Sequence, residues 1–184
     1  IRKAKQKNMA RAKVSPTIEL EYETFGDPQN PALVLMEGHG AQMVKWDTEY
    51  CKMFAAKNLF VIRFDNRDCG LSTKFDGIEV DLGATLKAAL LEETVPPVPY
   101  TLSDMASDVV GLLDHLKIDR AHIFGVSLGG MIAQVLTIEH PMRVRSLISV
   151  MSMTGEPEYG QSTPEAIGAL LSASPSDRAG YIEH

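Results

Sequence analysis

The sequence contains little cysteine and no long apolar run. Its two cysteines, Cys51 and Cys69, stand too far apart for a CxxC redox or zinc motif, and a single pair is weak support for a secreted protein. No apolar stretch approaches the roughly 20 residues that a membrane-spanning helix needs. We therefore expect free thiols, a cytoplasmic location and no membrane span.

Acidic residues are absent from the first 13 positions, although the whole chain has 24 of them and a net charge of −6. The same stretch is basic and holds Arg2, Lys3, Lys5, Lys7, Arg11 and Lys13. A basic tail can bind nucleic acid or an anionic membrane, but this one lacks aromatic residues and precedes an acidic body that would repel phosphate. It also lacks the apolar stretch of a secretory signal. We predict that residues 1–15 form a solvated tail, with no nucleic-acid or membrane partner.

The rest of the chain has the composition of one folded unit. With 184 residues, 45% of them hydrophobic, it can bury one sizeable core and does not require two. Residues 18–24 alternate apolar and polar side chains, which predicts a strand with one buried face at the margin of a sheet. Residues 32–36 are apolar throughout and residues 59–65 largely so, which is typical of strands covered on both faces.

Helical and extended segments alternate along the chain. Apolar residues recur at helical spacing over residues 46–57 and 102–116, with Thr101 or Ser103 available as the N-cap of the second helix. A helix over residues 128–139 lies between the apolar strands expected at 121–126 and 144–150. For residues 16–150 this order predicts the α/β class, with a mostly parallel sheet and helices on both faces.

Residues 151–184 have a different character, because glycine and proline interrupt them at Gly155, Pro157, Gly160, Pro164 and Pro175. Short helical pieces, such as residues 165–171, fit between these interruptions. We expect this segment to be the start of a cap or lid.

The pentapeptide Gly125-Val126-Ser127-Leu128-Gly129 has the G-x-S-x-G pattern of a nucleophile elbow. An attacking serine must protrude from the end of a strand, and a tight strand-to-helix turn achieves this. Such a turn crowds its backbone, so both glycines have a steric reason, and the next helix directs its positive end at the serine. The pattern falls where we expect a strand to meet a helix. We therefore predict Ser127 as the nucleophile and the Leu128 backbone N–H as an oxyanion donor.

A second oxyanion donor is expected in the loop after residues 32–36, which reads Glu37-Gly38-His39-Gly40-Ala41-Gln42. Its glycines allow close approach to a substrate, and by position the donor is the backbone N–H of His39. The alternative, the His39 ring as catalytic base, meets a geometric objection, because a loop beneath the oxyanion lies on the wrong side of the serine. His115, His122 and His140 stand at expected helix and strand ends and fit a base no better.

Three segments together indicate a protein family: residues 37–46, 65–72 and 122–131. The second reads Asp65-Asn66-Arg67-Asp68-Cys69-Gly70-Leu71-Ser72. With these segments the chain resembles the α/β-hydrolase superfamily, and specifically its bacterial esterase-like members, similar to aclacinomycin methylesterase. The resemblance covers about residues 16–184. Residues 65–72 look like the family's D-x-R-x-x-G-x-S turn, which shapes the loop after a central strand.

The resemblance implies a serine hydrolase that acts on carboxylic esters or related acyl substrates through an acyl-enzyme. Ser127 would be its nucleophile, and the backbone amides of His39 and Leu128 its oxyanion hole. No cofactor or metal is implied, and the partner is a small-molecule ester or acyl substrate. A homo-oligomer or a C-terminal fragment partner stays open. One departure is that many relatives have His-Gly where this chain has Glu37-Gly38.

The family's order is serine, then Asp or Glu, then His, with the last two on loops after later strands. Glu156 and His184 are the candidates that follow Ser127, and no pair of strands separates them, so we interpret both as surface residues. We expect the acid, the base and the C-terminal strands of the fold to lie beyond residue 184. Residues 1–184 alone are then expected to have negligible esterase activity.

Two other classes of protein are alternatives. A nucleotide-binding oxidoreductase could use Gly125, Gly129 and Gly130 as a phosphate loop, but it needs an acid about 20 residues on, and residues 149–151 contain none. A non-catalytic α/β-hydrolase-like chain that binds a ligand or pairs with a separate chain stays open. In that case a missing segment or another polypeptide would cover the outer edge of the strand at 144–150.

Overall fold

The computed structural model describes residues 9–78, 80–81, 84–85, 88, 94, 96–156, 159–160, 163 and 165–166. The chain divides into two compact units, residues 1–152 and 153–184, so the division falls close to the predicted end of the core at residue 150. All the strands and helices named below lie in the first unit. In the second unit Glu165 and Ala166 are helical, and the rest of the helix expected at 165–171 lies outside the described residues.

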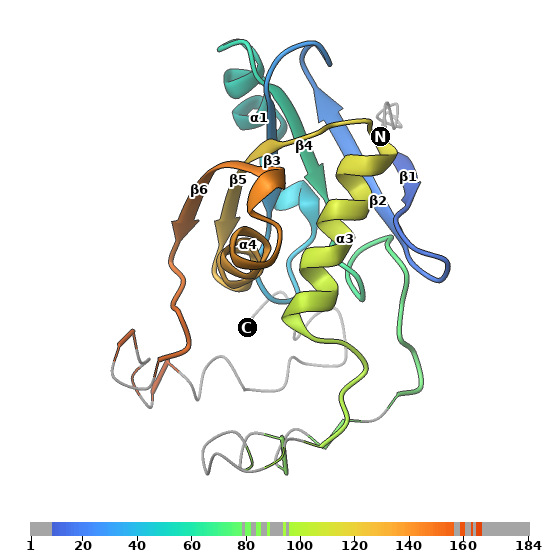
Figure 1. Ribbon diagram of the computed structural model, residues 1–184, viewed down its shortest axis with the longest axis vertical. Coiled ribbons are helices and arrows are strands. Elements are labelled where there is room, and N and C mark those ends of the chain that lie inside the picture. The colour runs from blue at the N-terminus through green and yellow to red at the C-terminus, as the bar shows by residue number, and fades with distance from the viewer. Residues whose placement is uncertain are drawn as a thin grey trace, which may run out of the picture. The chain divides into compact units, whose positions relative to one another are not determined.

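A six-stranded sheet forms the centre of the first unit, in the order β1-β2-β4-β3-β5-β6 (Figure 1). The strands are β1 (Ala10–Lys13), β2 (Glu19–Phe25), β3 (Ala32–Met36), β4 (Phe60–Phe64), β5 (Ala121–Val126) and β6 (Val144–Val150). β2 pairs antiparallel with both β1 and β4, whereas β4, β3, β5 and β6 pair parallel with one another in that order. Within the described part of the chain β6 pairs only with β5. The predicted mostly parallel sheet is therefore confirmed.

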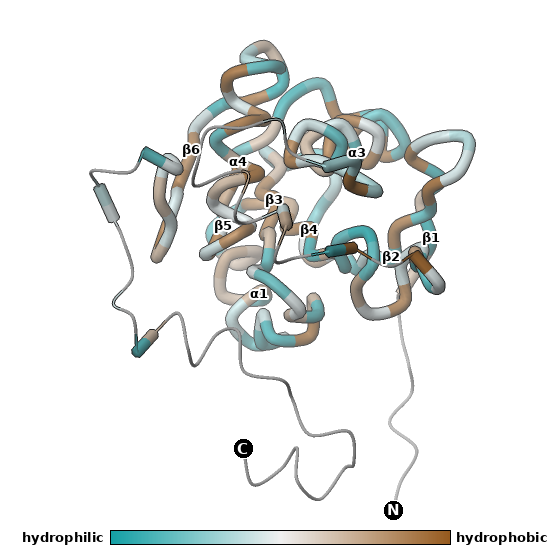
Figure 2. The backbone as a smooth tube through the Cα atoms, turned by 90° about the horizontal axis from the view of Figure 1, so that it is seen from below, coloured by the Kyte–Doolittle hydropathy of each residue, from teal (hydrophilic) through white to brown (hydrophobic). Residues whose placement is uncertain are grey.

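Helices cover both faces of the sheet, as predicted. Figure 2 shows α3 (Leu102–His115) and α4 (Leu128–Glu139) on one side of the row of strands and α1 (Thr48–Ala55) on the other. Two short 3-10 helices, η1 (Met43–Lys45) and η2 (Pro141–Arg143), also occur in the described part of the chain. No helix in the described part of the chain is long and apolar enough to cross a membrane.

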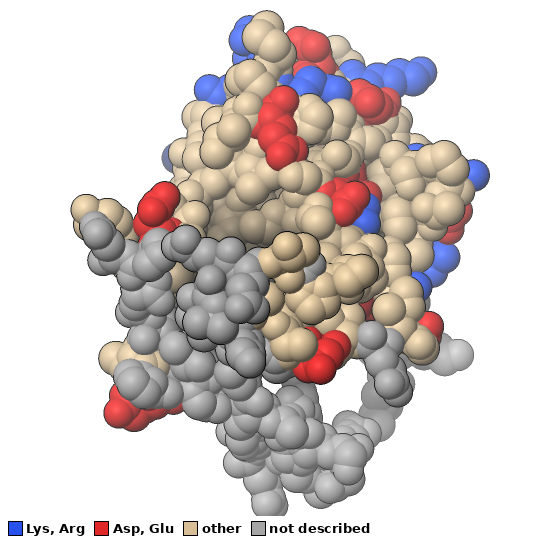
Figure 3. Space-filling model, turned by 60° about the horizontal axis from the view of Figure 1, so that its bottom comes forward, with Lys and Arg blue, Asp and Glu red and all other residues tan. Residues whose placement is uncertain are grey.

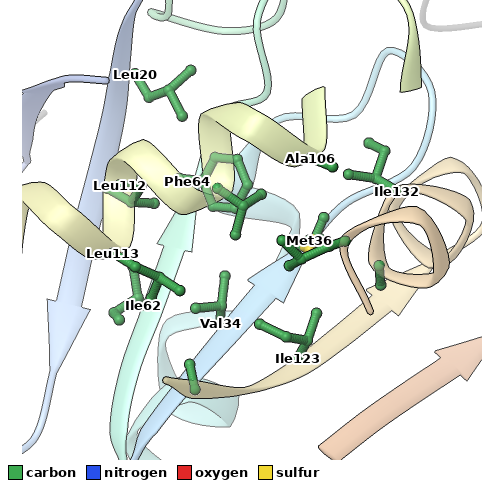
Figure 4. Packing of buried hydrophobic residues seen from close by; sticks show 14 of the residues in the cluster. Leu20, Val34, Met36, Ile62, Phe64, Ala106, Leu112, Leu113, Ile123 and Ile132 are labelled. Carbon is green, nitrogen blue, oxygen red and sulfur yellow. The ribbon is translucent and has the colours of Figure 1, made fainter. Parts of the chain in front are cut away.

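The apolar strands explain the position of the core. Every residue of β3 and β4 is buried, because helices pack on both faces of these two strands. In Figure 4, Leu112 and Leu113 of α3 face Ile62 of β4 and Val34 of β3, which are paired across the sheet. Burial of each such side chain contributes roughly 1.5–3 kcal/mol. This packing holds the carboxyl ends of β3, β4 and β5 in fixed relative positions.

The prediction of a solvated tail over residues 1–15 is wrong for its last part. Residues 10–13 form β1, Ala12 is fully buried, and β1 pairs along β2. The guanidinium of Arg11 bonds Glu21 at 3.2 Å and Glu19 at 3.4 Å. The acidic residues of β2 therefore neutralise a charge that we assigned to solvent. Residues 1–8 lie outside the described residues.

The helix expected at 46–57 begins later than predicted, because Asp47 is its N-cap. The Asp47 carboxylate accepts hydrogen bonds from the amides of Glu49 and Tyr50, so α1 starts at Thr48. The preceding residues form η1 instead, and α1 ends at Ala55.

The N-cap of α3 is Thr101, one of the two residues proposed for it. The Thr101 hydroxyl accepts from the Asp104 amide at 3.2 Å, and the Asp104 carboxylate accepts from the Thr101 amide at 2.7 Å. This reciprocal pair is a capping box, which satisfies amides that the first turn of a helix leaves free. The Thr101 hydroxyl also lies 2.7 Å from the Asp104 carboxylate, to which it donates, and this bond together with the one from the Thr101 amide holds the pKa of the Asp104 carboxyl below its ordinary value of 3.8.

We expect Thr101→Ala to lower the free energy of unfolding by about 1 kcal/mol, because the bonds of the Thr101 hydroxyl with the Asp104 amide and carboxylate are lost. Because the pKa of the Asp104 carboxyl is lower in the folded chain than in the unfolded chain, this carboxylate stabilises the fold at pH values above its unfolded pKa. The stabilisation is lost as the pH falls through the lower, folded pKa. Asp104→Asn should therefore flatten the dependence of stability on pH below about pH 4. Urea unfolding between pH 2 and 7 measures both effects. Asp119→Asn, which changes an exposed carboxylate outside the box, is the control; an equal flattening there would contradict the assignment.

Candidate active site

Ser127 stands at the sharp turn between β5 and α4, where the elbow was predicted. Its backbone has φ 53° and ψ −121°, a conformation that costs a non-glycine residue on the order of 1–3 kcal/mol. The turn is held by hydrogen bonds from the Ser127 amide to the Val150 carbonyl at 2.9 Å and from the Gly130 amide to the Ser127 carbonyl at 2.9 Å. The side chain is exposed at the carboxyl end of the parallel strands. The Ser127 side chain is therefore accessible at this edge of the sheet.

Close backbone contacts account for the two glycines of the pentapeptide. A Cβ added at Gly125 would collide with the carbonyl of Gly129, and one added at Gly129 would collide with the carbonyl of Met36. The absence of side chains therefore lets α4 lie against both β5 and the end of β3. The steric reason predicted for these glycines is present.

The loop after β3, which we name the glycine loop (residues 37–43), lies directly beside the serine. A Cβ added at Gly38 would stand 3.1 Å from the Ser127 Cβ and 3.5 Å from its Oγ. His39, whose amide was predicted as an oxyanion donor, follows Gly38 and is exposed. Leu128, which carries the other predicted donor, is the first residue of α4, so its amide has no partner within the helix.

A cavity of about 320 Å³ opens beside these residues. It lies between the glycine loop, the turn after β4 and the start of α3, and its lining residues are Gly38, His39, Gly40, Asn66, Arg67, Asp68, Cys69, Tyr100, Thr101, Leu102, Met105 and Leu128. Figure 3 looks toward the carboxyl ends of the strands, and on the atoms drawn in colour acidic and basic side chains are interspersed among uncharged ones. The cavity brings together both residues with predicted oxyanion amides.

Sequence reasoning did not single out the cavity residues from the turn after β4, which we name the arginine turn (residues 65–72). Arg67 forms a two-bond ion pair with Asp108 of α3, with N–O distances of 2.7 and 2.8 Å. The Tyr100 hydroxyl bonds the Asp68 carboxylate at 3.2 Å. The D-x-R-x-x-G-x-S pattern marked this turn as a shaped loop, but the contact with α3 joins segments about 40 residues apart in the sequence.

Three of the histidines lie away from the serine. His115 packs against an aromatic ring of β2. His122 lies at the start of β5, with its Nδ1 2.7 Å from the Ser146 hydroxyl, and five residues of strand separate it from Ser127 by about 16 Å. His140 follows the last residue of α4, about 18 Å along the helix axis from its start. None of the three can take a proton from Ser127 in this arrangement.

The remaining base and acid candidates do not complete a triad among the described residues. His39 lies in the glycine loop, and its ring forms no hydrogen bond with the Ser127 hydroxyl. Glu156 is exposed in the second unit, and His184 lies outside the described residues. Both cysteines are free thiols. In the described part of the chain no group of three or more His, Cys, Asp or Glu side chains could hold a metal ion.

The fold agrees with comparisons to known proteins. The family model of the alpha/beta hydrolase fold matches residues 31–184, and the chain belongs to this family. It is similar to rhodomycin D methylesterase DauP of Streptomyces sp. (strain C5), with 32% identity over 71% of this chain and 38% of that protein. It is also similar to 3-oxoadipate enol-lactonase 2 of Acinetobacter baylyi, with 28% identity over 82% of this chain and 48% of that protein.

A solved structure shows the same similarity. The crystal structure of a hydrolase from Pseudomonas aeruginosa PA01 matches with a TM-score of 0.64 and 28% identity, over 91% of this chain and 54% of that one. The chain is therefore a member of a hydrolase family. The chain spans about half or less of the length of the curated relatives named here.

Proposed function

We propose that this protein is a serine hydrolase that acts on carboxylic esters or related acyl substrates, with Ser127 as its nucleophile. The observation that carries the proposal is the strained, exposed Ser127 with Gly38 packed against its side chain. A strained residue persists only where its surroundings hold it, and such residues gather at functional sites. Membership of the alpha/beta hydrolase family and the esterase and lactonase relatives support the same chemistry.

In the proposed reaction the Ser127 Oγ attacks the ester carbonyl and forms a tetrahedral intermediate. The backbone amides of His39 and Leu128 donate hydrogen bonds to its oxyanion, and the amino-terminal end of α4 adds a favourable partial charge. A histidine base takes the hydroxyl proton and gives it to the leaving alcohol, and water then hydrolyses the acyl-enzyme. The amides are part of the backbone, so they are in place before substrate binds.

The cavity supports a small substrate. Its volume of about 320 Å³ is at the lower end of the range for small-molecule sites. Leu102, Met105 and Leu128 supply apolar surface to it. We infer that this cavity holds the acyl part of a short ester, with the carbonyl carbon at Ser127.

Pre-steady-state kinetics of the purified protein at its natural length test this function. With p-nitrophenyl acetate and butyrate we expect a burst of nitrophenol equal to the enzyme concentration, because acylation releases the alcohol before water attacks. Acid quenching followed by peptide mass spectrometry should locate the acyl group on Ser127. Steady turnover without a covalent adduct, or an adduct on another residue, would refute the nucleophile.

Residues 1–184 expressed alone are a useful comparison. None of the described histidines bonds the Ser127 hydroxyl, so we propose that this piece hydrolyses the same esters at a negligible rate. Turnover by the piece that disappears in Ser127→Ala would contradict this and would point to a base within residues 1–184.

A further inference from the structure

The glycine loop, which contains the proposed oxyanion donor His39, is bonded from one side by the arginine turn. Three side chains of the turn each bond the loop backbone. The bonds join Asn66 Nδ2 to the Glu37 carbonyl at 3.2 Å, Cys69 Sγ to the Ala41 carbonyl at 3.0 Å, and the Met43 amide to Asp65 Oδ1 at 2.7 Å. They therefore hold the start, the middle and the end of the loop.

The side chains that make these bonds are themselves fixed. Asp65 is 2% exposed and Asn66 is 6% exposed. The second oxygen of Asp65 accepts from the Leu71 amide at 2.8 Å, so both carboxylate oxygens are used. Burial raises the pKa of the Cys69 thiol, which therefore stays protonated and able to donate near neutral pH.

The loop has little else to fix its shape between these points. Gly40 has φ +66° and an open surrounding, and the one backbone bond within this stretch joins the Ala41 amide to the Gly38 carbonyl at 3.3 Å. Glycine backbone has wide conformational freedom, so a loop with two glycines requires outside contacts to hold one geometry. A shift of about 1 Å in a catalytic group can cost on the order of 100-fold in rate.

We propose that the arginine turn is a clamp that positions the oxyanion loop, with Asn66 and Cys69 as positioning residues for catalysis. Because each bonds the loop on one side of His39, together they set where the His39 amide lies relative to the Ser127 Oγ. The clamp rests on the proposed function, since it acts through the oxyanion hole. Its effect therefore appears in the stabilisation of the tetrahedral intermediate and leaves the binding of the ester unchanged.

The test compares Asn66→Ala, Cys69→Ala and Cys69→Ser in the protein at its natural length. We expect Asn66→Ala to lower kcat for p-nitrophenyl butyrate about 10- to 100-fold and Cys69→Ala about 3- to 10-fold, below the loss of a whole donor. KM should stay within about three-fold of wild type. Cys69→Ser retains a donor to Ala41 and should recover most of the activity.

Two inhibitors distinguish a displaced oxyanion loop from a general loss of order in the site. Butylboronic acid forms a tetrahedral adduct with the serine, whereas butyrate resembles the ground state. In the clamp variants the inhibition constant of the boronic acid should rise by the same factor by which kcat/KM falls, while that of butyrate stays constant.

Thr73→Val is the matched control, because Thr73 joins the same turn to β2. Its hydroxyl bonds the Glu19 amide at 2.8 Å and the Glu19 carbonyl at 3.2 Å, with no contact to the glycine loop. We expect lower stability and unchanged kcat. A kcat loss in Thr73→Val equal to that in Asn66→Ala would overturn the clamp, because loosening of the turn would then be the cause.

The two proposals fail in different ways. Full activity of Ser127→Ala would refute the proposed function, and the clamp with it. If Ser127→Ala is inactive while Asn66→Ala and Cys69→Ala retain the wild-type kcat and boronic acid inhibition, the clamp alone is wrong.

Discussion

Ser127→Ala is expected to lower kcat for short-chain nitrophenyl esters on the order of 10⁴- to 10⁶-fold in the protein at its natural length, because it removes the hydroxyl that we propose forms the acyl-enzyme bond. The cavity and the backbone donors remain, so KM should change little. Steady-state kinetics measure both values, and the nitrophenol burst should disappear. A decrease of less than about 10-fold would remove Ser127 from the mechanism.

Ser127→Gly provides a control for the backbone. Both variants lack the nucleophile, but glycine adopts positive φ without the cost that alanine retains at φ 53°. We therefore expect Ser127→Gly to be inactive and about 1 kcal/mol more stable to urea than Ser127→Ala. Equal stability of the two variants would show that the turn relaxes, and strain would then no longer support the assignment of this site.

Asp108→Asn is expected to lower the free energy of unfolding by about 3–5 kcal/mol, because it leaves a buried guanidinium without its counter-charge. Asp108 and Arg67 have side chains that are 5% and 9% exposed and are joined by two bonds. Arg67 also donates to the Asp104 carbonyl at 3.1 Å and lies over the rings of Phe75 and Tyr100. Urea unfolding followed by circular dichroism measures the loss.

A double variant distinguishes an unpaired charge from lost packing. Arg67→Met with Asp108→Leu removes both charges and keeps side chains of similar size, so it should recover most of the stability that Asp108→Asn loses. If the double variant is as unstable as the single one, packing around the pair, rather than its charge, holds the arginine turn on α3. In either case the arginine turn depends on a helix that it meets only in the folded chain.

Much of the fold could be predicted because local pattern and final position agree. β3 is buried on both faces, and its five consecutive apolar residues indicate this directly. β5, the elbow and α4 occur where an apolar strand runs into G-x-S-x-G and then into helical spacing, so Ser127 was predicted from neighbours within a few residues. The sequence offered two residues as the N-cap of α3, Thr101 and Ser103, and the hydrogen bonds of the structure identify Thr101.

The predictions that were wrong or missing depend on partners far away in the sequence. From the sequence, Arg11 was predicted to be a solvated charge. In the folded chain it forms ion pairs with Glu19 and Glu21 of β2. In the sequence, Asn66 and Cys69 are recognised only as residues of a turn. In the folded chain both form hydrogen bonds with the backbone of the glycine loop. The start of α1 depended on one side-chain cap, Asp47, which a count of apolar spacing does not include.

By itself, the sequence determined the class of the fold and the position of the elbow serine, because apolar strands, helical periodicity and the glycines around Ser127 act over short distances. Only the tertiary structure decided what surrounds that serine. The clamp and the ion pair of Arg67 join residues that are 22 to 41 positions apart, and no local pattern specifies which of them will meet. Packing of the strands and α3 decides this, since it aligns the carboxyl ends of β3, β4 and β5 at one edge of the sheet.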